Sequence, residues 1–474
     1  MKVRNTENDL SNRAAFPEWV KDAVFYQIFP DRFCNGDLTN DPPETEPWGN
    51  PPNRTNFFGG DLQGIIEKLD YLQGLGVNAL YLNPIFKART NHKYDTTDYF
   101  EIDPSFGSND LFIKFVHELH RRDMRIILDG VFNHCGDSIW AFEDVKIHGE
   151  SSRYADWFIV RSFPVTANPP SYYTCGGAPY LPKFNINNPQ VQDYIFQVAT
   201  HWLKEASIDG WRLDCCQKIP LLFWQEFRKI VKDVNPQAYL VGEIWREAAP
   251  CIQGDTFDGI TNYRLRELIL NYCAAFILDA EDFSYEMEQL YKSLGSAAPA
   301  MLNLLGCHDT PRILTVFQGE VDRMLIALAF LFTTIGTPLI YYGDEVGLLG
   351  GMDPDCRRTM QWQEGLWNLR IQNAYRKLID LRKHHIALRR GNFESLLAFE
   401  RVFAYRRILE KDEVIIILNP GAIVENLAIP TNSTVEQWHD LFNDKEYLSV
   451  NGRLNFTRVP AVSFSILAPV KNES

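Results

Sequence analysis

Gly210-Trp-Arg-Leu-Asp214 is a short apolar run that ends on a carboxylate, and Ala238-Tyr-Leu-Val-Gly-Glu-Ile-Trp245 repeats the pattern with Glu243. Two more runs follow the same rule, Arg125-Ile-Ile-Leu-Asp129 and Met301-Leu-Asn-Leu-Leu-Gly-Cys-His308-Asp309. Runs this short and this apolar are typical of parallel strands, which are buried on both faces. Two carboxylates at strand ends suggest acid/base and nucleophilic chemistry.

Eight such apolar runs follow one another along the chain, at 23–30, 79–86, 125–132, 210–214, 238–245, 259–265, 301–309 and 338–345. Amphipathic stretches of helical period lie between several of them, for example at 62–75, 108–122 and 191–205. Strands that alternate with helices in this way predict an α/β fold, and eight strands predict a TIM (β/α)8 barrel. The catalytic groups of such a barrel lie at the C-terminal ends of its strands.

Two segments depart from the barrel pattern. Residues 135–189, after the third predicted strand, are too long for a normal loop and mix Pro, Gly, Tyr and Trp irregularly, which predicts an inserted subdomain over the barrel mouth. After about residue 390 the sequence alternates as strands do, at 395–405, 413–418 and 461–467, which predicts a C-terminal antiparallel β-sandwich domain. The predicted domains are a barrel of 1–134 and 190–388, an insertion of 135–189 and a β domain of 389–474.

Charge and cysteine usage restrict the partners and the compartment. The net charge of −14 argues against nucleic acid and anionic membranes as partners and favours a neutral or cationic substrate. The nine cysteines include no CxxC pair, which indicates reduced thiols rather than a disulfide framework or a zinc site. The first ten residues are too polar for a secretory segment, and no run is long enough to span a bilayer, so we expect a cytoplasmic protein.

Seven motifs carry most of the candidate chemistry: Asn91-His-Lys-Tyr-Asp95, Asp129-Gly-Val-Phe-Asn-His134, Leu181-Pro-Lys-Phe-Asn185, Gly210-Trp-Arg-Leu-Asp214, Gly242-Glu-Ile-Trp245, His308-Asp309 and Gly336-Thr-Pro-Leu-Ile-Tyr-Tyr-Gly-Asp-Glu345. Their order and rough spacing resemble the signature regions of the α-amylase family of glycoside hydrolases. The third motif is most similar to the version in the neopullulanase, cyclomaltodextrinase and maltogenic amylase group. One motif alone would be weak support, whereas seven in order are specific and extend the resemblance over nearly the whole chain.

The resemblance implies retaining hydrolysis of α-glucans, with Asp214 as the nucleophile and Glu243 as the acid/base. Arg212 lies two residues before Asp214 and therefore on the same face of the strand, where its charge should keep Asp214 ionised. Glu243 must instead carry a proton at the working pH, which requires apolar or like-charged surroundings. Asp309 resembles the third catalytic carboxylate of the family, which stabilises the transition state.

The resemblance also implies a set of side chains that bind the substrate: Tyr94, His92, His134, His308 and Arg212 around the sugar that is cleaved, Trp245, Gln217 and Lys218 on the leaving-group and acceptor side, and Asp353 and Arg357 on the non-reducing side. The sequence Cys215-Cys-Gln-Lys218 departs from the small-residue and acidic sequence usual in the family. We therefore expect the linkage preference and the ratio of hydrolysis to transfer to differ.

Several of these side chains, and Asp129, also have a purely structural explanation. Asp129 could be a helix N-cap, as many strand-end aspartates are. His134 and His308 could be core histidines whose nitrogens are hydrogen-bonded within the protein, and Trp245 could serve only in packing. Asp353 and Arg357 could form an ordinary surface ion pair.

Oxygen-bearing side chains gather in Asn35-Gly-Asp37-Leu-Thr-Asn40-Asp41 and again in Gly59-Gly60-Asp61. Hard oxygen ligands in a short loop suit Ca²⁺, although the spacing is not that of an EF-hand. The loop resembles the calcium loop of the neopullulanase group, which implies a ligand set of Asn35, Asp37, Asn40, Asp41, Gly59 and Asp61. A solvated turn rich in Asn and Asp is the alternative.

Members of this group usually carry an additional N-terminal β domain that helps to form a dimer. Here the first predicted strand begins at about Ala23, so we expect that domain to be lacking, and both a monomer and a homodimer stay open. The expected function is hydrolysis of α-1,4 bonds, with α-1,6 bonds as a further option, in maltooligosaccharides, cyclodextrins or pullulan-type chains. Transglycosylation is an alternative because water and a sugar hydroxyl compete for one intermediate. A non-catalytic glucan-binding homologue is a third possibility, against which the intact carboxylates count.

Overall fold

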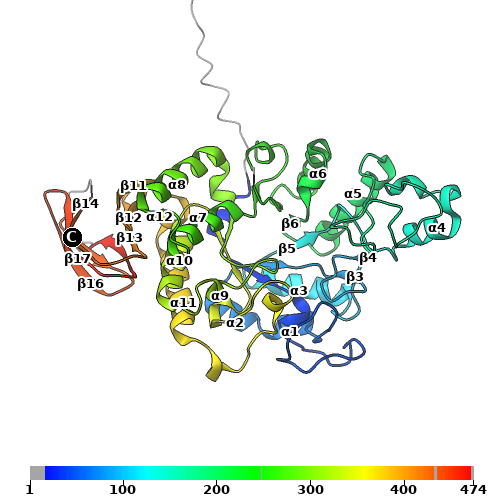
Figure 1. Cartoon of the computed structure of the whole chain (residues 1–474), viewed down its shortest axis with the longest axis horizontal. Coiled ribbons are helices and arrows are strands. Elements are labelled where there is room, and N and C mark those ends of the chain that lie inside the picture. Colours follow the sequence, from blue (N-terminus) through cyan, green and yellow to red (C-terminus); the bar gives the residue numbers. More distant parts are fainter. Residues whose placement is uncertain (1–15, 247, 432–434, 471–474) are drawn as a thin grey trace, which may run out of the picture.

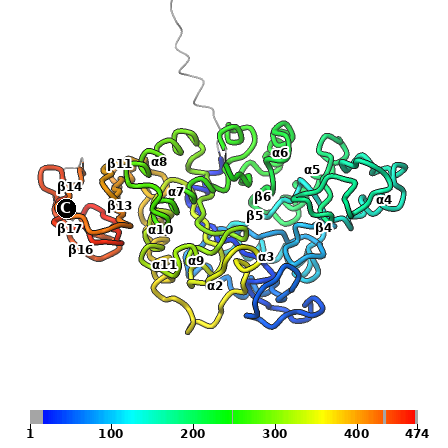
Figure 2. Tube along the Cα trace, viewed as in Figure 1, coloured from blue at the N-terminus to red at the C-terminus, as the bar shows by residue number. Residues whose placement is uncertain are grey.

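A computed structural model describes residues 16–246, 248–431 and 435–470, so the polar first ten residues lie outside the described part of the chain. Figure 1 shows the C-terminal strands at one end of the molecule, a central barrel, and α4 (Trp140–His148) at the other end. The tube in Figure 2 follows the same arrangement from the blue barrel start to the red C-terminal strands. Within the described ranges, no helix combines the length and the apolar character needed to cross a membrane.

The central part is a parallel eight-stranded sheet in the order β8-β7-β6-β5-β2-β1-β10-β9. Every predicted run supplies one of its strands, which are β1 (Phe25–Ile28), β2 (Ala79–Leu82), β5 (Arg125–Gly130), β6 (Gly210–Leu213), β7 (Tyr239–Gly242), β8 (Gly259–Ile260), β9 (Leu302–Leu304) and β10 (Thr337–Tyr341). Thr261 forms a parallel bridge with Leu302, which brings the two edges of the sheet together. The predicted TIM barrel is confirmed.

The barrel interior explains why its strands are apolar on both faces. Phe25, Ile127 and Val241 pack inside the barrel as part of one buried cluster, while the alternate residues of the strands face the helices. Glycine permits the closest approach between strands: a Cβ at Gly210 would lie 2.0 Å from the Tyr239 carbonyl oxygen. Any larger residue there would push β6 and β7 apart.

Helices surround the barrel, and they are α1 (Leu62–Glu67), α2 (Leu69–Leu75), α3 (Asn109–Arg121), α5 (Pro189–Glu205), α6 (Leu221–Val234), α7 (Tyr263–Cys273), α8 (Ala280–Leu294), α9 (Ile313–Val316), α10 (Val321–Thr333), α11 (Leu369–His384) and α12 (Ile386–Arg390). The predicted helix at 62–75 is divided at Lys68, whose φ and ψ of −101° and 7° interrupt it. The predicted strand at 259–265 ends early, because the Asn262 side chain accepts from Leu265 N and begins α7.

Two irregular segments rise over the C-terminal ends of the strands. The hairpin of β3 (Phe86–Ala88) and β4 (Thr96–Ile102) follows β2 and was not predicted. After β5 the chain forms α4 and short 3-10 turns, and isolated bridges join Phe158 to Phe184 and Thr174 to Pro182. This segment is the inserted part expected from the irregular sequence, while its exact bounds of 135–189 stay a prediction.

The C-terminal part is an antiparallel sheet in the order β11-β12-β13-β18-β15-β16-β17-β14, formed by β11 (Asn392–Phe399), β12 (Val402–Leu409), β13 (Asp412–Asn419), β14 (Val424–Pro430), β15 (Gln437–Asp440), β16 (Lys445–Val450), β17 (Arg453–Val459) and β18 (Ser463–Pro469). The run 395–405, predicted as one strand, is two strands joined by a turn at Glu400, whose φ is 53°. The sheet packs on α8, α10 and α12. It confirms the predicted C-terminal β domain, whose bounds of 389–474 stay a prediction.

Candidate active site

Asp214 and Glu243 lie next to each other at the C-terminal ends of two paired strands. The register of β6 and β7 places Leu213 beside Gly242, so the two residues that follow are neighbours. Carboxylate oxygens of Asp214 and Glu243 lie within 4.8 Å of each other. Glycosidases that retain configuration hold their two carboxyl groups about 5–5.5 Å apart, and inverting enzymes about 6.5–9.5 Å apart. The short separation fits the retaining class.

Arg212 binds three carboxylates at once. Its Nη1 lies 2.8 Å from Asp129 Oδ1 and 2.8 Å from Asp214 Oδ1, and its Nη2 lies 3.0 Å from Glu243 Oε1. The guanidinium is fully buried, so these ion pairs are little screened by water. Arg212 therefore sits beneath the reaction site and fixes the positions of the carboxylates around it.

Arg212 does not, however, keep Asp214 strongly acidic. Burial and the nearby charge of Glu243 raise the pKa of Asp214 to about 7, although Arg212 acts in the opposite direction. Arg212 thus favours the charged form of Asp214, as expected, but burial and the second carboxylate oppose it, which the sequence could not show.

The side chain of Glu243 accepts hydrogen bonds at both oxygens. Cys215 N donates to Oε2 at 2.9 Å and Trp245 Nε1 donates to Oε1 at 3.1 Å. One face of the Trp245 ring stacks on Tyr263, with centroids 3.7 Å apart and planes at 7°. The Trp245 side chain is 45% exposed, so it both orients Glu243 and offers an open aromatic face to the solvent.

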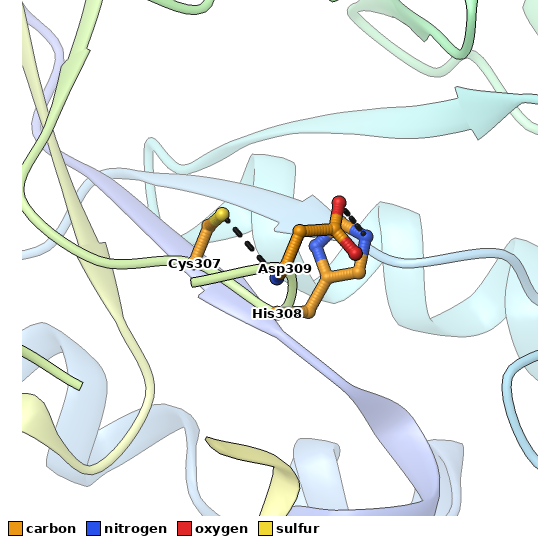
Figure 3. Close-up of side chains that lie close together, drawn as sticks. All are labelled: Cys307, His308 and Asp309. Atoms are coloured by element: carbon orange, nitrogen blue, oxygen red, sulfur yellow. Dashed lines mark hydrogen bonds and ion pairs between the residues drawn. The ribbon is translucent and has the colours of Figure 1, made fainter. Parts of the chain in front are cut away.

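Asp309 and His308 form a hydrogen-bonded pair in the loop after β9. His308 Nε2 lies 3.0 Å from Asp309 Oδ2, and Asp309 N–H points to the Cys307 sulfur at 3.4 Å, as Figure 3 shows. Gln27 Nε2 donates to His308 Nδ1 at 2.8 Å, which leaves the proton of the neutral ring on Nε2. Burial, together with Arg357, lowers the pKa of His308 well below its ordinary value, so the ring is neutral.

Tyr94 lies beside this pair. Its ring stacks on His308 with centroids 5.6 Å apart, and its hydroxyl lies 2.9 Å from Asp129 Oδ2 and 2.7 Å from His308 Nε2. Asp129 also accepts from Tyr81 and Arg212, so its carboxylate is fully engaged. Asp129 thus has a structural role. It holds the side chains of Tyr81, Tyr94 and Arg212 in place and does not cap a helix.

A single cavity of about 810 Å³ collects most of the predicted site residues: Asp214, Glu243, Asp309, Tyr94, His92, His134, His308, Asp353 and Arg357. Arg357 links two of these carboxylates. Its Nη2 lies 3.3 Å from Asp309 Oδ1, and its Nη1 lies 3.1 Å from Asp353 Oδ1. His134 is buried, and its Nε2 has no hydrogen-bond partner among the described residues. The Cys175 sulfur contacts the same ring.

Gln217 and Lys218 do not line this cavity, because they lie exposed on the short 3-10 helix that follows β6. Sequence reasoning missed other lining residues, among them Arg54, Tyr180, Cys175 and Cys215. It also missed Gln27, although a glutamine inside the buried strand β1 is an unusual residue that could have drawn attention.

The predicted calcium loop folds into a compact cluster. Asp61 caps α1 and accepts from Gly64 N at 2.6 Å and Asp37 N at 2.8 Å. Asn35 Oδ1 and Asn40 Oδ1 are buried oxygens without a hydrogen-bond partner in the described part of the chain. Asn35 Nδ2 donates to Asp41 Oδ1 at 2.8 Å. A Cβ at Gly59 would lie 2.1 Å from the same oxygen. Unsatisfied oxygens beside a carboxylate fit a hard cation such as Ca²⁺.

Two other clusters contain groups that metals bind, namely Cys307, His308 and Asp309, and Asp214, Cys215 and Glu243. In the first, the sulfur and the ring nitrogens already take part in hydrogen bonds with the chain. In the second, the Arg212 guanidinium lies on both carboxylates and repels a cation. Both clusters are explained by the network of the active site.

Comparison with known proteins agrees with this geometry. Residues 27–368 match the family described as alpha amylase, catalytic domain. A cyclomaltodextrinase from Thermoanaerobacter pseudethanolicus is 45% identical over 433 residues, which cover 91% of this chain and 75% of that protein. Neopullulanase 2 from Thermoactinomyces vulgaris is 44% identical over 454 residues, which cover 94% and 77%. The structure of a cyclic α-maltosyl-(1→6)-maltose hydrolase from Arthrobacter globiformis, in complex with cyclic α-maltosyl-(1→6)-maltose, has a TM-score of 0.88 and 42% identity and covers 96% of this chain and 100% of that chain.

Proposed function

Because this chain belongs to the α-amylase family of glycoside hydrolases, we propose that it hydrolyses the α-1,4 and α-1,6 glucosidic bonds of maltooligosaccharides, cyclodextrins and pullulan-type chains with retention of configuration. The names of the relatives support this choice of substrates, since they include a cyclomaltodextrinase, a neopullulanase and a hydrolase of a cyclic saccharide with a 1→6 bond. The observation that carries the retaining mechanism is the separation of less than 4.8 Å between carboxylate oxygens of Asp214 and Glu243.

The reaction follows from this pair. Asp214 attacks the anomeric carbon while Glu243 donates a proton to the oxygen of the leaving group, which leaves the sugar as an ester on Asp214. Glu243 then takes a proton from water as that water attacks the ester. Two inversions at the same carbon give net retention.

The rest of the cavity holds the sugar for this attack. The neutral His308 ring, with its proton on Nε2, holds the partly exposed Asp309 carboxylate, which presents acceptors to neighbouring hydroxyls. His134 lines the same cavity. Hydrogen bonds placed where charge and shape change in the transition state lower the barrier more than they tighten ground-state binding.

Trp245 provides the surface on the leaving-group side. Its ring is held from below by Tyr263 and is 45% exposed, so its free face can stack on the flat apolar face of a sugar. Because Trp245 also donates to Glu243, a sugar on this ring would lie next to the acid/base. The same surface would serve water-driven hydrolysis and transfer to a sugar acceptor.

Ca²⁺ is proposed as a structural ion in the loop of Asn35, Asp41 and Gly59, supported by the unsatisfied oxygens of Asn35 and Asn40. It would join the segment after β1 to the start of α1 and takes no part in the reaction. A cytoplasmic location is also proposed. It is supported by the nine cysteines, all in the described part of the chain, which are all free thiols as in a reducing compartment.

Product analysis tests the function. Purified enzyme is incubated separately with β-cyclodextrin, pullulan, starch and defined maltooligosaccharides, the products are separated by chromatography, and proton NMR records which anomer forms first. The α-anomer as first product supports retention, and the β-anomer contradicts it. Asp214→Asn protein prepared in the same way controls for contaminating hydrolases. Repeating each reaction with added glucose measures how much of the intermediate passes to a sugar acceptor.

A further inference from the structure

Two cysteines of the substrate cavity differ from all the others. The described part of the chain contains all nine cysteines, and seven of them are buried, while Cys175 and Cys215 are partly exposed. Both line the cavity that also holds Asp214 and Glu243. Cys175 comes from the segment inserted after β5, and Cys215 lies two residues after the end of β6, so the two thiols reach the cavity from separate parts of the chain.

The position of each thiol is fixed by the backbone around it. Cys215 has a φ of 46°, its N–H donates to Glu243, and its sulfur lies within 4.8 Å of carboxylate oxygens of both Asp214 and Glu243. Cys175 N–H donates to Leu181 O at 2.9 Å. The Cys175 sulfur interacts with the Cys215 thiol and with the His134 ring. The two sulfurs are thus neighbours without being bonded.

The charges around the two sulfurs make them chemically different. Cys215, then the His134 ring, lowers the pKa of Cys175 to about 4, although partial burial and other groups act on it as well. Cys175 and burial raise the pKa of Cys215, and the adjacent carboxylates add to the effect. The surroundings therefore favour the thiolate form at Cys175 and the thiol form at Cys215. The buried Nε2 of His134, which lacks a hydrogen-bond partner in the described chain, belongs to the same corner of the cavity.

We propose that Cys175 and Cys215 form a thiol-modification site that reacts with low-molecular-weight disulfides and closes to an internal disulfide across the substrate cavity. A partly exposed thiolate beside a histidine is the reactive form of cysteine, and a second thiol next to it can resolve a mixed disulfide. This site goes beyond the hydrolysis of glucans, since the cleavage reaction uses neither sulfur.

The chemistry balances in two exchange steps. The Cys175 thiolate attacks one sulfur of the small disulfide, forms a mixed disulfide and releases one small thiolate, which takes a proton from solvent. Cys215 then loses its proton to solvent and attacks the Cys175 sulfur, which forms the Cys175–Cys215 bond and releases the second small thiolate. In sum, two protein thiols are oxidised and one small disulfide is reduced to two thiols.

Oxidation at this place closes the active site. The first adduct on Cys175 occupies the cavity of about 810 Å³ in which the sugar must lie. The internal disulfide then ties the inserted segment to the residue whose N–H holds Glu243 Oε2. Reduction by a dithiol reopens the cavity, so the modification is a reversible block of the hydrolase.

The test treats the purified enzyme with oxidised glutathione and analyses it by peptide mapping without reduction. The expected result is a cross-linked peptide that contains Cys175 and Cys215, with most of the activity towards maltotriose lost and then restored by dithiothreitol. Mapping reads the thiols directly, so it stays valid whichever glucan proves to be the substrate. The same treatment is applied to a control peptide that contains a thiol. If the glutathione oxidises the control peptide while alkylation shows that Cys175 and Cys215 are both still free, the proposal is overturned.

Variants locate the effect. Cys175→Ser should keep the activity that it has before treatment, and Cys215→Ser should be blocked by an adduct on Cys175 that cannot be resolved. Cys251→Ser, which removes a cysteine that is 9% exposed outside the cavity, should be inactivated like the parent. Each variant is compared with its own untreated sample, so an effect of the substitution on basal activity does not enter. Equal inactivation of all three variants would assign the oxidation elsewhere.

Discussion

The carboxylates of Asp214 and Glu243 approach within 4.8 Å, and one guanidinium, that of Arg212, contacts both of them. Burial and the nearby charge of Glu243 therefore both disfavour the charged form of Asp214. Catalysis needs the proton of the pair on Glu243 and the charge on Asp214. In the free site the pKa of Asp214 is raised to about 7 by burial and by Glu243, and Glu243 accepts hydrogen bonds from Cys215 N and Trp245 Nε1.

Asp214→Asn should abolish turnover while substrate binding remains. Asn keeps the shape of the side chain and loses the nucleophile, so kcat should fall on the order of 10⁴-fold or more. Calorimetric titration with maltotriose checks the binding, and a sensitive fluorogenic maltoside checks the rate. Activity above a few per cent of the parent would assign the nucleophile elsewhere.

The same substitution should stabilise the protein at neutral and alkaline pH. The pKa of Asp214 is raised from its ordinary 3.8 to about 7 by burial and by Glu243, so the native state favours the protonated form. The cost of burying the charge is absent below about pH 4, grows as the pH rises to about 7, and then stays constant. The Tm of Asp214→Asn relative to the parent should therefore increase between about pH 4.5 and 8.

A control of opposite sign is Asp22→Asn. Asp22 is partly buried, but its pairs with Arg390 and Arg389 lower its pKa, so the charged form stabilises the native state at neutral pH. Its removal should lower the Tm at pH 8 and matter less as the pH falls through the acid range. Identical pH dependences for the two variants would contradict both assignments.

Glu243→Gln should affect two substrates differently and shift a pH profile. α-Maltosyl fluoride leaves without a proton, so the variant should keep far more activity on it than on maltotriose. Since the Glu243 charge is, after burial, the largest cause that raises the pKa of Asp214, its removal should move the acid limb of kcat/KM for the fluoride to lower pH. Equal losses on both substrates would remove Glu243 from the acid role, and an unmoved limb would show that the two groups are not coupled.

Removal of Ca²⁺ should lower the Tm and leave the chemistry at low temperature largely unchanged. The ion would satisfy the buried oxygens of Asn35 and Asn40, and mass action makes the Tm rise again as the ion is returned. Differential scanning calorimetry in EGTA, followed by Ca²⁺ titration, measures this. Asn40→Ala should lose the response, and Asn50→Ala, at an exposed position of the same segment, should keep it. A parent Tm indifferent to chelator and ion would leave the solvated turn as the explanation.

The barrel could be predicted because its strands are buried on both faces, so that each appears as an apolar run whatever surrounds it. Asp214, Glu243 and Asp309 could be predicted as a group because each closes such a run within motifs that resemble those of the family. The run 395–405 could not be divided correctly, since the alternation continues through the turn at Glu400. Helix starts such as Asn262 depend on one side-chain hydrogen bond, which the apolar pattern around it conceals.

Contacts between side chains of distant loops could not be predicted from the sequence. Nothing in the sequence around Cys175 indicates that it meets Cys215, because their contact depends on how the inserted segment folds back. Gln217 and Lys218 are predicted from the family resemblance to lie on the acceptor side; the turn after β6 leaves both exposed and outside the cavity, so their role stays a prediction. Closeness in sequence does not fix direction once a residue such as Cys215 takes a φ of 46°.

Gln27 is the remaining test of how the site is positioned. Its Nε2 donates to His308 Nδ1 at 2.8 Å and to Asn83 Oδ1 at 2.9 Å, and the side chain is fully buried. By holding Nδ1 as an acceptor it keeps the His308 proton on Nε2, where Asp309 and the substrate need it. Gln27→Leu removes that donor and should lower kcat about 10–100-fold, the equivalent of about 1.4–2.7 kcal/mol in the barrier, with a smaller effect on KM.

Gln27→Glu is the sharper variant, because a carboxylate opposite Nδ1 attracts the ring proton to that nitrogen. Nitrogen-15 NMR of the histidine rings should then show that the His308 tautomer changes from Nε2–H to Nδ1–H, a change that a merely loosened core would not produce. Gln372→Leu removes an equally buried glutamine (3% exposed) outside the cavity and should change the Tm without changing kcat. A normal kcat in Gln27→Glu together with an altered tautomer would show that catalysis does not depend on the proton at Nε2, and would leave Asp309 to bind the sugar hydroxyls without help from the ring.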